Sequence, residues 1–170
     1  MSIANPLPLT DAELQDPTPV LEELHAEPVP TAQPARIFSP DAKQKAISDA
    51  HTAVPEASKY FLGGSAGLGL KAADIDIFML VPNVNEVAAR LADYGFTYPR
   101  FNDYDNKGFI PFRKGDLNII VMDDERDYDR TEIAYKVCQY LVSEGIHPTK
   151  EQRKVIHHIL QGKPASFATQ

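Results

Sequence analysis

The order of apolar and polar residues follows two recognisable periods after residue 38. Apolar residues three and four positions apart predict helices, and short runs of β-branched and aromatic residues predict strands. We expect helices within 38–53, 83–95, 129–145 and 149–162, and strands within 59–63, 73–81, 96–101, 107–114 and 116–122. The last of these runs predicts a central strand, whereas Pro99 and Pro111 mark edge strands or bulges. This order predicts a mixed sheet with helices packed on it, in the α+β or α/β range.

Capping residues indicate where the helices begin. Ser39 is a good N-cap for the first helix. Asn83 and Thr149 each precede a glutamate or glutamine by three residues, which is the capping-box spacing. Asp129 is the expected N-cap of the third helix, and the acidic stretch 122–129 before it is expected to be a solvated turn.

The first 38 residues differ in composition from the rest. Eight of the 14 prolines and a net charge of −5 fall within residues 1–40. Proline at this density blocks both helix and sheet, so we expect an extended arm over 1–38 with at most one helical turn around "PVLEELHA". The arm is either a disordered tail or a segment that folds onto a protein partner or a neighbouring subunit. The folded domain is expected to span 39–165.

Composition and charge exclude several classes of protein. No apolar run approaches the length of about 18 residues needed to span a membrane, and the N-terminus lacks the basic and apolar segments of a secretory signal. The single cysteine, Cys138, cannot form an internal disulfide and is expected to be a buried apolar residue. We therefore expect a cytoplasmic protein. The net charge of −7 argues against non-specific nucleic-acid binding. It allows a basic protein partner, or an anionic substrate held through a metal ion.

A glycine-rich stretch, "YFLGGSAGLGLKAADIDIFMLV", raises the question of phosphate binding. In the Walker pattern, Gly-Lys must be followed by Ser or Thr, but here Leu70 separates Gly69 from Lys71 and neither Ser nor Thr follows. The pattern Gly-x-Gly-x-x-Gly is not met either. These two phosphate-loop patterns are therefore excluded.

Two carboxylates in the same stretch predict a metal site. Side chains alternate in a strand, so Asp74 and Asp76 point to one face, about 7 Å apart at Cα, and Ile75 and Ile77 point to the other. Mg²⁺ typically binds one or two carboxylates together with substrate phosphates, which removes the repulsion between the acids. The turn at 63–65 precedes the acids, and its backbone N–H groups are expected to receive phosphates.

The segment "LGGS" followed nine residues later by "DIDIF" resembles the signature of the nucleotidyltransferase fold, the DNA polymerase β superfamily. The resemblance covers about residues 60–125 and implies an α+β fold, a mixed sheet with flanking helices, as a minimal nucleotidyltransferase fold with an extended N-terminal arm. More loosely, the chain is similar to small stand-alone members encoded by phages, which would place it in the host cytoplasm.

The resemblance implies a role for each matching residue. Asp74 and Asp76 would bind Mg²⁺ or Mn²⁺, and Gly63, Gly64 and Ser65 would hold the triphosphate. Asp116, at the start of a later strand, is the candidate third metal ligand and would help to deprotonate the acceptor. Asn118 shares the face of Asp116 and cannot replace a carboxylate.

The resemblance implies transfer of a nucleotidyl group from a nucleoside triphosphate to a hydroxyl of a protein, RNA or small molecule. Ala66-Gly67 stands where the tRNA-tailing branch often has Arg-Asp, and no second domain is large enough to grip a polymer. The alternative is a non-catalytic protein of this fold that binds and inhibits or modulates a host protein. His157 and His158 are adjacent on a helix, which is poor spacing for a metal, so we expect them to be surface or packing residues.

Overall fold

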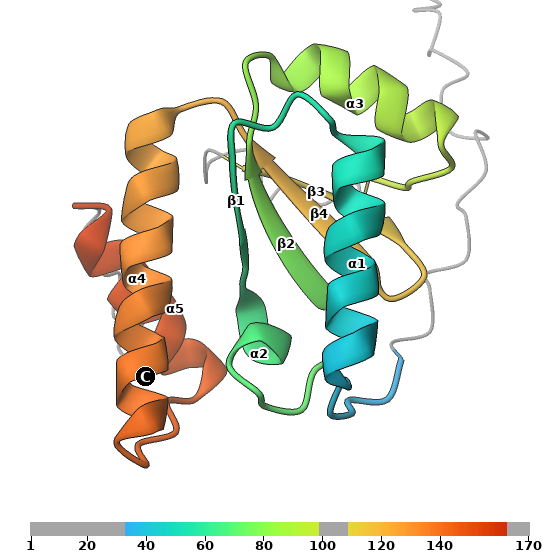
Figure 1. Cartoon of the computed structure of the whole chain (residues 1–170). Coiled ribbons are helices and arrows are strands. Elements are labelled where there is room, and N and C mark those ends of the chain that lie inside the picture. The colour runs from blue at the N-terminus through green and yellow to red at the C-terminus, as the bar shows by residue number, and fades with distance from the viewer. Residues whose placement is uncertain (1–32, 99–108, 163–170) are drawn as a thin grey trace, which may run out of the picture. The chain divides into compact units, whose positions relative to one another are not determined.

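The computed structural model describes residues 33–98 and 109–162. Five helices and four strands lie in these ranges (Figure 1). The elements are α1 (Pro40–Ala53), β1 (Lys59–Leu62), α2 (Gly64–Gly67), β2 (Ile75–Leu80), α3 (Val84–Asp93), β3 (Ile110–Lys114), β4 (Leu117–Met122), α4 (Glu125–Ser143) and α5 (Lys150–Leu160).

The four strands form one mixed sheet in the order β1-β2-β4-β3. The two central strands, β2 and β4, run parallel, and each outer strand is antiparallel to its neighbour. Every residue of β4 is buried, which confirms the central position that its β-branched run predicts. β3 lies at an edge, as its Pro111 predicts, because proline cannot donate a hydrogen bond to a second neighbour.

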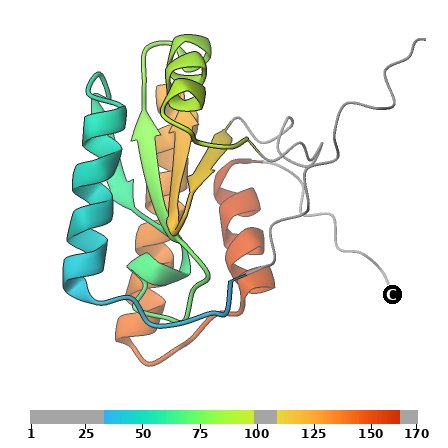
Figure 2. The same cartoon turned by 90° about the vertical axis from the view of Figure 1, so that its right-hand side faces the viewer.

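The two faces of the sheet have different roles. Ile75, Ile77, Met79 and Val81 are buried in the main hydrophobic core, together with apolar residues of α1 and α3. Full burial of one such side chain stabilises the fold by roughly 1.5–3 kcal/mol. Figure 2 shows α1 and α5 on opposite sides of the sheet. The acidic face of β2 is therefore left for α4 and α5 to cover.

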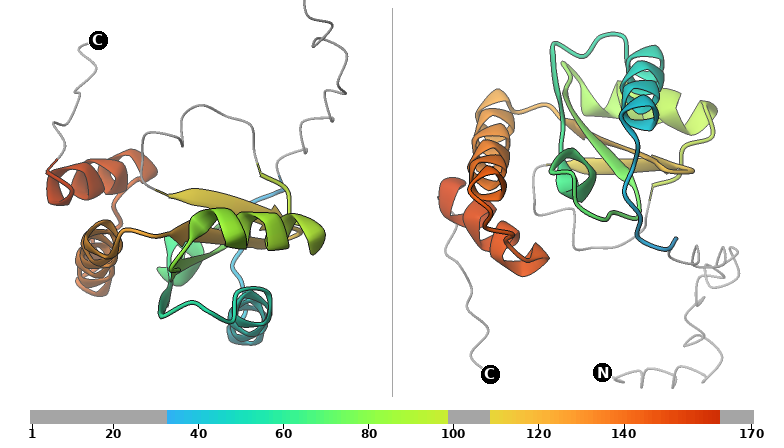
Figure 3. Two further views of the ribbon diagram at one scale, coloured as in Figure 1. Left: turned by 90° about the horizontal axis from the view of Figure 1, so that it is seen from above. Right: turned by 60° about the horizontal axis from the view of Figure 1, so that its bottom comes forward.

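α4 and α5 form an antiparallel helix pair, and both views of Figure 3 show them side by side. Arg130 Nη1 donates to the carbonyl of Gln161 at 3.2 Å, so the start of α4 contacts the end of α5. The next residue of α4, Thr131, has its Oγ1 3.0 Å from Nε2 of His157, which lies one turn before Gln161. These contacts set the orientation of the two helices relative to each other, and thereby the helix faces that are directed at the sheet.

The beginning of α4 corrects the prediction for 122–129. The helix starts at Glu125, four residues before the expected cap, because Asp124 accepts a hydrogen bond from the backbone of Asp127 at 2.8 Å. The side chain of Asp129 instead pairs with Lys59 of β1 at 2.8 Å. Tyr128 is only 1% exposed, so this acidic segment is a helical turn anchored by a buried ring.

The other predicted caps are confirmed. Ser39 Oγ accepts from the backbone of Ala42, and the Asn83 side chain accepts from the first backbone N–H groups of α3. Thr149 and Gln152 form the reciprocal capping box of α5. The caps could be read from the sequence because each is a local contact within three residues.

The architecture is the α+β fold with a mixed sheet and flanking helices that the sequence predicts. Within the described part, Arg36 of the expected arm pairs with Ala72 through a single β-bridge. Three parts of the predictions lie outside the described residues. They are the arm up to residue 32, the C-terminal residues 163–165, and the end of the expected strand 96–101. No helix in the described ranges has the length and apolarity required to cross a membrane.

Candidate functional site

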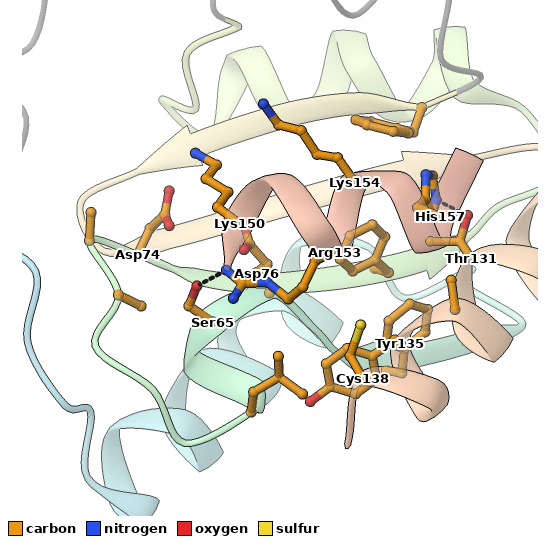
Figure 4. A pocket seen from close by; sticks show the side chains of 18 of the residues that line it. Ser65, Asp74, Asp76, Thr131, Tyr135, Cys138, Lys150, Arg153, Lys154 and His157 are labelled. Carbon is orange, nitrogen blue, oxygen red and sulfur yellow. Dashed lines mark hydrogen bonds between the residues drawn. The ribbon is translucent and has the colours of Figure 1, made fainter. Parts of the chain in front are cut away.

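The face of β2 opposite the main core opens into a cavity of about 410 Å³ between the sheet and α4 and α5 (Figure 4). Asp74, just before β2, and Asp76, within it, both line this cavity. Their neighbours Ile75 and Ile77 are buried on the other face. The alternation expected from the sequence therefore places both acids in one cavity, which we call the α4/α5 cavity.

Asp76 lies against a polar residue of the neighbouring strand, Asn118 of β4. Asn118 is its partner on β4 in the parallel register, and Asn118 Nδ2 donates to Asp76 Oδ1 at 2.7 Å. Burial and the negative charge of Asp74 raise the pKa of Asp76 to about 6, although the hydrogen bond from Asn118 acts in the opposite direction. Ionisation of Asp76 therefore destabilises the folded protein, and a bound cation would reduce this destabilisation.

Asp74 already has a positively charged partner. Arg113 Nη2, on the edge strand β3, lies 2.6 Å from Asp74 Oδ2. The Asp74 side chain is 20% exposed and that of Arg113 is 50% exposed. Because the arginine is so exposed, this ion pair contributes little to stability and is readily exchanged.

Asp116 is not among the residues that line the α4/α5 cavity. Arg36 Nη2 lies 2.5 Å from Asp116 Oδ2, and both side chains are about two-fifths exposed, at 43% and 41%. The backbone of Asp116 lies beside Asp74, since its carbonyl accepts from the N–H of Ile75 at 2.7 Å. Its carboxylate is thus close in the fold to the other acids but is held by Arg36.

The predicted glycine turn forms the start of α2, next to the acids. Gly64 has a φ of +59°, and a Cβ there would lie 1.9 Å from Asp76 Oδ2. A Cβ on Gly63 would lie 2.5 Å from the ring of Phe78. Both glycines are therefore required for the close approach of this turn to β2. Ser65 lines the cavity, where its Oγ accepts from Arg153 Nη2 at 2.8 Å.

Three cationic residues of α5 line the same cavity as the acids, and the sequence interpretation missed them. Lys150, Arg153 and Lys154 line the cavity and, with His157, follow the spacing i, i+3, i+4, i+7 of one helix face. The positive charge of Lys150 helps to lower the pKa of Asp76. In the described part of the chain, the side chain of Lys150 forms no hydrogen bond or ion pair. The helical spacing was the signal that could have revealed these residues.

Lys71, another cavity-lining residue, adds a further positive charge. Arg113 and Lys114 do not line the cavity; Arg113 pairs with Asp74, and Lys114 Nζ donates to the carbonyl of Tyr94 at 2.6 Å. Most of the lysines and arginines that line the cavity therefore belong to α5.

The rest of the wall is largely aromatic and apolar. Phe61 and Phe78 are stacked with their ring centroids 4.7 Å apart, and Tyr135 of α4 lies 5.4 Å from Phe61. Cys138 is 4% exposed, as expected, and burial raises the pKa of its thiol, which keeps it protonated. The cysteine is therefore part of the wall and is not an activated nucleophile.

The donor atoms around Asp76 suit a hard cation such as Mg²⁺. Both acids offer oxygen ligands, and Asn118 Oδ1 is buried and accepts no hydrogen bond in the described structure. Within residues 33–98 and 109–162, no three His, Cys, Asp or Glu side chains are grouped so that they could hold a metal. Two carboxylates fit Mg²⁺ when substrate phosphates complete its coordination.

Comparisons with known proteins assign no family. No protein-family model matches the chain, and no curated protein matches it. Among solved structures, the chain is similar to the protein described under "Structural Basis for the Activity of a Cytoplasmic RNA Terminal U-transferase", with 17% identity and a TM-score of 0.30. The match covers 57% of this chain and 32% of that one, so this chain spans about a third of the length of that protein. The function therefore has to be argued from the α4/α5 cavity itself.

Proposed function

We propose that this protein binds a nucleoside triphosphate with Mg²⁺ or Mn²⁺ in the α4/α5 cavity and transfers the nucleotidyl group to a hydroxyl of a protein, RNA or small molecule. The observation that carries the proposal is the arrangement of charge. Asp74 and Asp76 line one cavity together with Lys150, Arg153 and Lys154, and the Lys154 ammonium also pairs with Glu151 at 2.9 Å. A metal with its triphosphate is the ligand whose positive and negative charges complement both walls.

Each group has a distinct part in binding. Asp74 and Asp76 would hold the metal, which in its bound state neutralises charge on the phosphate oxygens and favours attack at phosphorus. Lys150 and Arg153 would contact phosphate oxygens, and Arg153 is already oriented by Ser65 Oγ and by the carbonyl of Pro148, each at 2.8 Å. Gly64 lets the turn approach the carboxylate of Asp76 closely.

The proposed transfer is a displacement at the α-phosphorus. The acceptor oxygen forms a bond to this phosphorus, the bond to the oxygen that bridges to the β-phosphate breaks, and pyrophosphate leaves with that oxygen. The acceptor proton passes to a carboxylate. Asp116 is the candidate for this step, and it becomes available only when its ion pair with Arg36 opens.

A second function is favoured by the position of Asp116. Its carboxylate pairs with Arg36, and the residue opposite Asp76 on β4 is the amide Asn118. A site with two acids and no third can bind a metal-bound nucleotide without catalysing transfer. The protein would then be a nucleotide-binding protein of this fold that acts by binding another protein, for example a host protein.

Calorimetry with the full chain tests nucleotide binding. Wild type is titrated with nucleoside triphosphates with and without Mg²⁺, beside Asp76→Asn and Lys150→Gln. Asp93→Asn and Lys136→Gln are the controls, because they remove the same charges at exposed positions outside the cavity. We expect metal-dependent binding that is lost in Asp76→Asn, weakened about tenfold in Lys150→Gln, and retained in both controls. A folded wild type that binds no triphosphate would disprove the proposal.

Transfer is tested separately with triphosphates labelled on the α-phosphate. Label that becomes covalently attached to an added protein, RNA or hydroxyl compound, with release of pyrophosphate, supports the transferase. Metal-dependent binding without transfer, including in an Arg36→Gln variant that frees Asp116, supports the non-catalytic function.

A further inference from the structure

We propose that the end of the α4/α5 cavity remote from the acids binds the base of the nucleotide, and that Thr131 and His157 select among bases there. The inference rests on the proposed function, because it requires the triphosphate to lie at the charged end. It adds a specificity site on α4 and α5 that reads a planar heteroaromatic ring with hydrogen-bonding groups on its edge.

The cavity changes from charged to aromatic along two elements, β2 and α5. On β2, Asp76 is followed two residues later on the same face by Phe78. On α5, Lys150 and Arg153 are followed by His157 one turn on. Figure 4 shows Asp74 and Asp76 at one end and Thr131 with His157 at the other. A ligand that spans the cavity must therefore be anionic at one end and largely apolar at the other.

The walls of the apolar end suit a flat ring. The rings of Phe61 and Phe78 are parallel within 1°, and Tyr135 is tilted by 29° from Phe61. Phe61 and Phe78 are only partly buried because they face the cavity. Aromatic faces of this kind bind any of the four bases by stacking, so they provide affinity without sequence preference.

The preference has to come from polar atoms, and Thr131 provides one. It is 4% exposed, and its Oγ1 lies 2.8 Å from the carbonyl of Asp127 and 3.0 Å from His157 Nε2. The threonine hydroxyl has one donor and two acceptor positions, so these two contacts leave it able to accept one further hydrogen bond. His157 Nε2 also lies 3.2 Å from Gln161 Nε2.

A buried polar pair of this kind penalises the wrong ligand. A base that presents the complementary group satisfies the hydroxyl, whereas one that does not leaves a polar atom unpaired in a closed site. The binding free energy therefore differs from one base to another, whereas the contribution of the triphosphate stays the same. A change in the preference among bases without a change in triphosphate affinity therefore distinguishes a specificity site from a general change in the shape of the cavity.

The test is calorimetry in Mg²⁺ with ATP, GTP, CTP, UTP and inorganic tripolyphosphate on the full chain. Thr131→Val removes the hydroxyl with little change of shape, and Thr131→Ser restores it. Thr52→Val is the matched control, because Thr52 Oγ1 makes the same kind of bond to a carbonyl four residues earlier, on α1 and away from the cavity. Circular dichroism and thermal melting establish that each variant is folded.

We expect wild type to bind its best base at least about tenfold more tightly than its worst. In Thr131→Val this ratio should fall to within about threefold while tripolyphosphate affinity stays unchanged, and Thr131→Ser and Thr52→Val should keep the wild-type ratio. Phe78→Leu should weaken binding of all four nucleotides but not of tripolyphosphate. If tripolyphosphate binds and the four bases are equivalent, or if Thr131→Val keeps the ratio, this inference is wrong and the proposed function stands. If neither tripolyphosphate nor any nucleotide binds, both fail.

Discussion

Asp76 and Asn118 face each other across the parallel strands β2 and β4, and Asn118 Nδ2 donates to Asp76 Oδ1 at 2.7 Å. The pairing joins residues that are 42 positions apart in the chain. It places an amide where a third carboxylate would repel the first two. Asp76 is therefore kept in place by a neutral partner, and its charge is left to be balanced by a ligand.

The first prediction concerns the dependence of stability on pH. Burial and Asp74 raise the pKa of folded Asp76 to about 6, from an ordinary value of 3.8. Between these values the folded state holds a proton that the unfolded chain has lost. The stability that this proton provides is complete below about pH 4 and is lost as the pH rises through 6. An ionised Asp76 thus costs roughly 2–3 kcal/mol at neutral pH.

Asp76→Asn should therefore raise the free energy of unfolding at pH 7.5 by up to roughly 2–3 kcal/mol, because the amide carries no charge and can still accept from Asn118. The gain should shrink towards zero near pH 4. Urea denaturation at several pH values measures it, with Asp93→Asn as a control of equal charge. A variant that is less stable than wild type at pH 7.5 would show that the charge of Asp76 is already compensated.

The second prediction concerns Asn118→Asp. A third carboxylate opposite Asp76 adds a like charge in a buried site, so thermal stability at pH 7.5 should fall by several degrees without a metal. Mg²⁺ should restore more stability to this variant than to wild type, because a metal that binds only the folded state stabilises it. Melting curves with and without Mg²⁺ measure both effects. Equal responses to Mg²⁺ would place the metal away from Asn118.

The third prediction concerns the ion pair of Arg113 with Asp74. Arg113→Gln removes a cation that competes with Mg²⁺ for Asp74, so Mg²⁺ affinity should rise severalfold at low salt. Stability should change by less than about 1 kcal/mol, because Arg113 is half exposed. Calorimetric titration with Mg²⁺ measures the affinity. Lys45→Gln, which opens the exposed pair with Asp49 on α1, should leave Mg²⁺ binding unchanged.

The fourth prediction compares two glycines with nearly equal backbone angles. Gly64 and Gly115 have φ values of +59° and +58°, but only at Gly64 would a Cβ meet another atom, Asp76 Oδ2 at 1.9 Å. Gly115→Ala should cost about 1–2 kcal/mol from backbone strain alone. Gly64→Ala should cost more, and it should also abolish metal-dependent nucleotide binding because Asp76 must move.

Denaturation and calorimetry on the same two preparations separate the effects. If Gly64→Ala binds nucleotide as wild type does, the close contact between the turn and Asp76 is a packing feature without a role in the site.

How far the sequence could be interpreted depended on the range of the contacts involved. The caps at Ser39, Asn83 and Thr149 were predictable because a side chain meets backbone groups within three residues. The start of α4 was misplaced because two aspartates five positions apart, Asp124 and Asp129, are both plausible caps. A long-range ion pair with Lys59 engages the side chain of Asp129, and the cap is Asp124.

The sequence by itself determined the four longer helices apart from the start of α4, the four strands, the buried face of β2 and the acid pair on its other face. Capping contacts and alternation along one strand are local properties. Only the tertiary structure decided that Asn118 meets Asp76, that Arg36 pairs with Asp116, and that cationic residues of α5 line the same cavity as the acids. These contacts join residues 42 and 80 positions apart, or helices whose orientation depends on packing. Strand register and helix packing are set by burial of the whole core, which no single segment of sequence specifies.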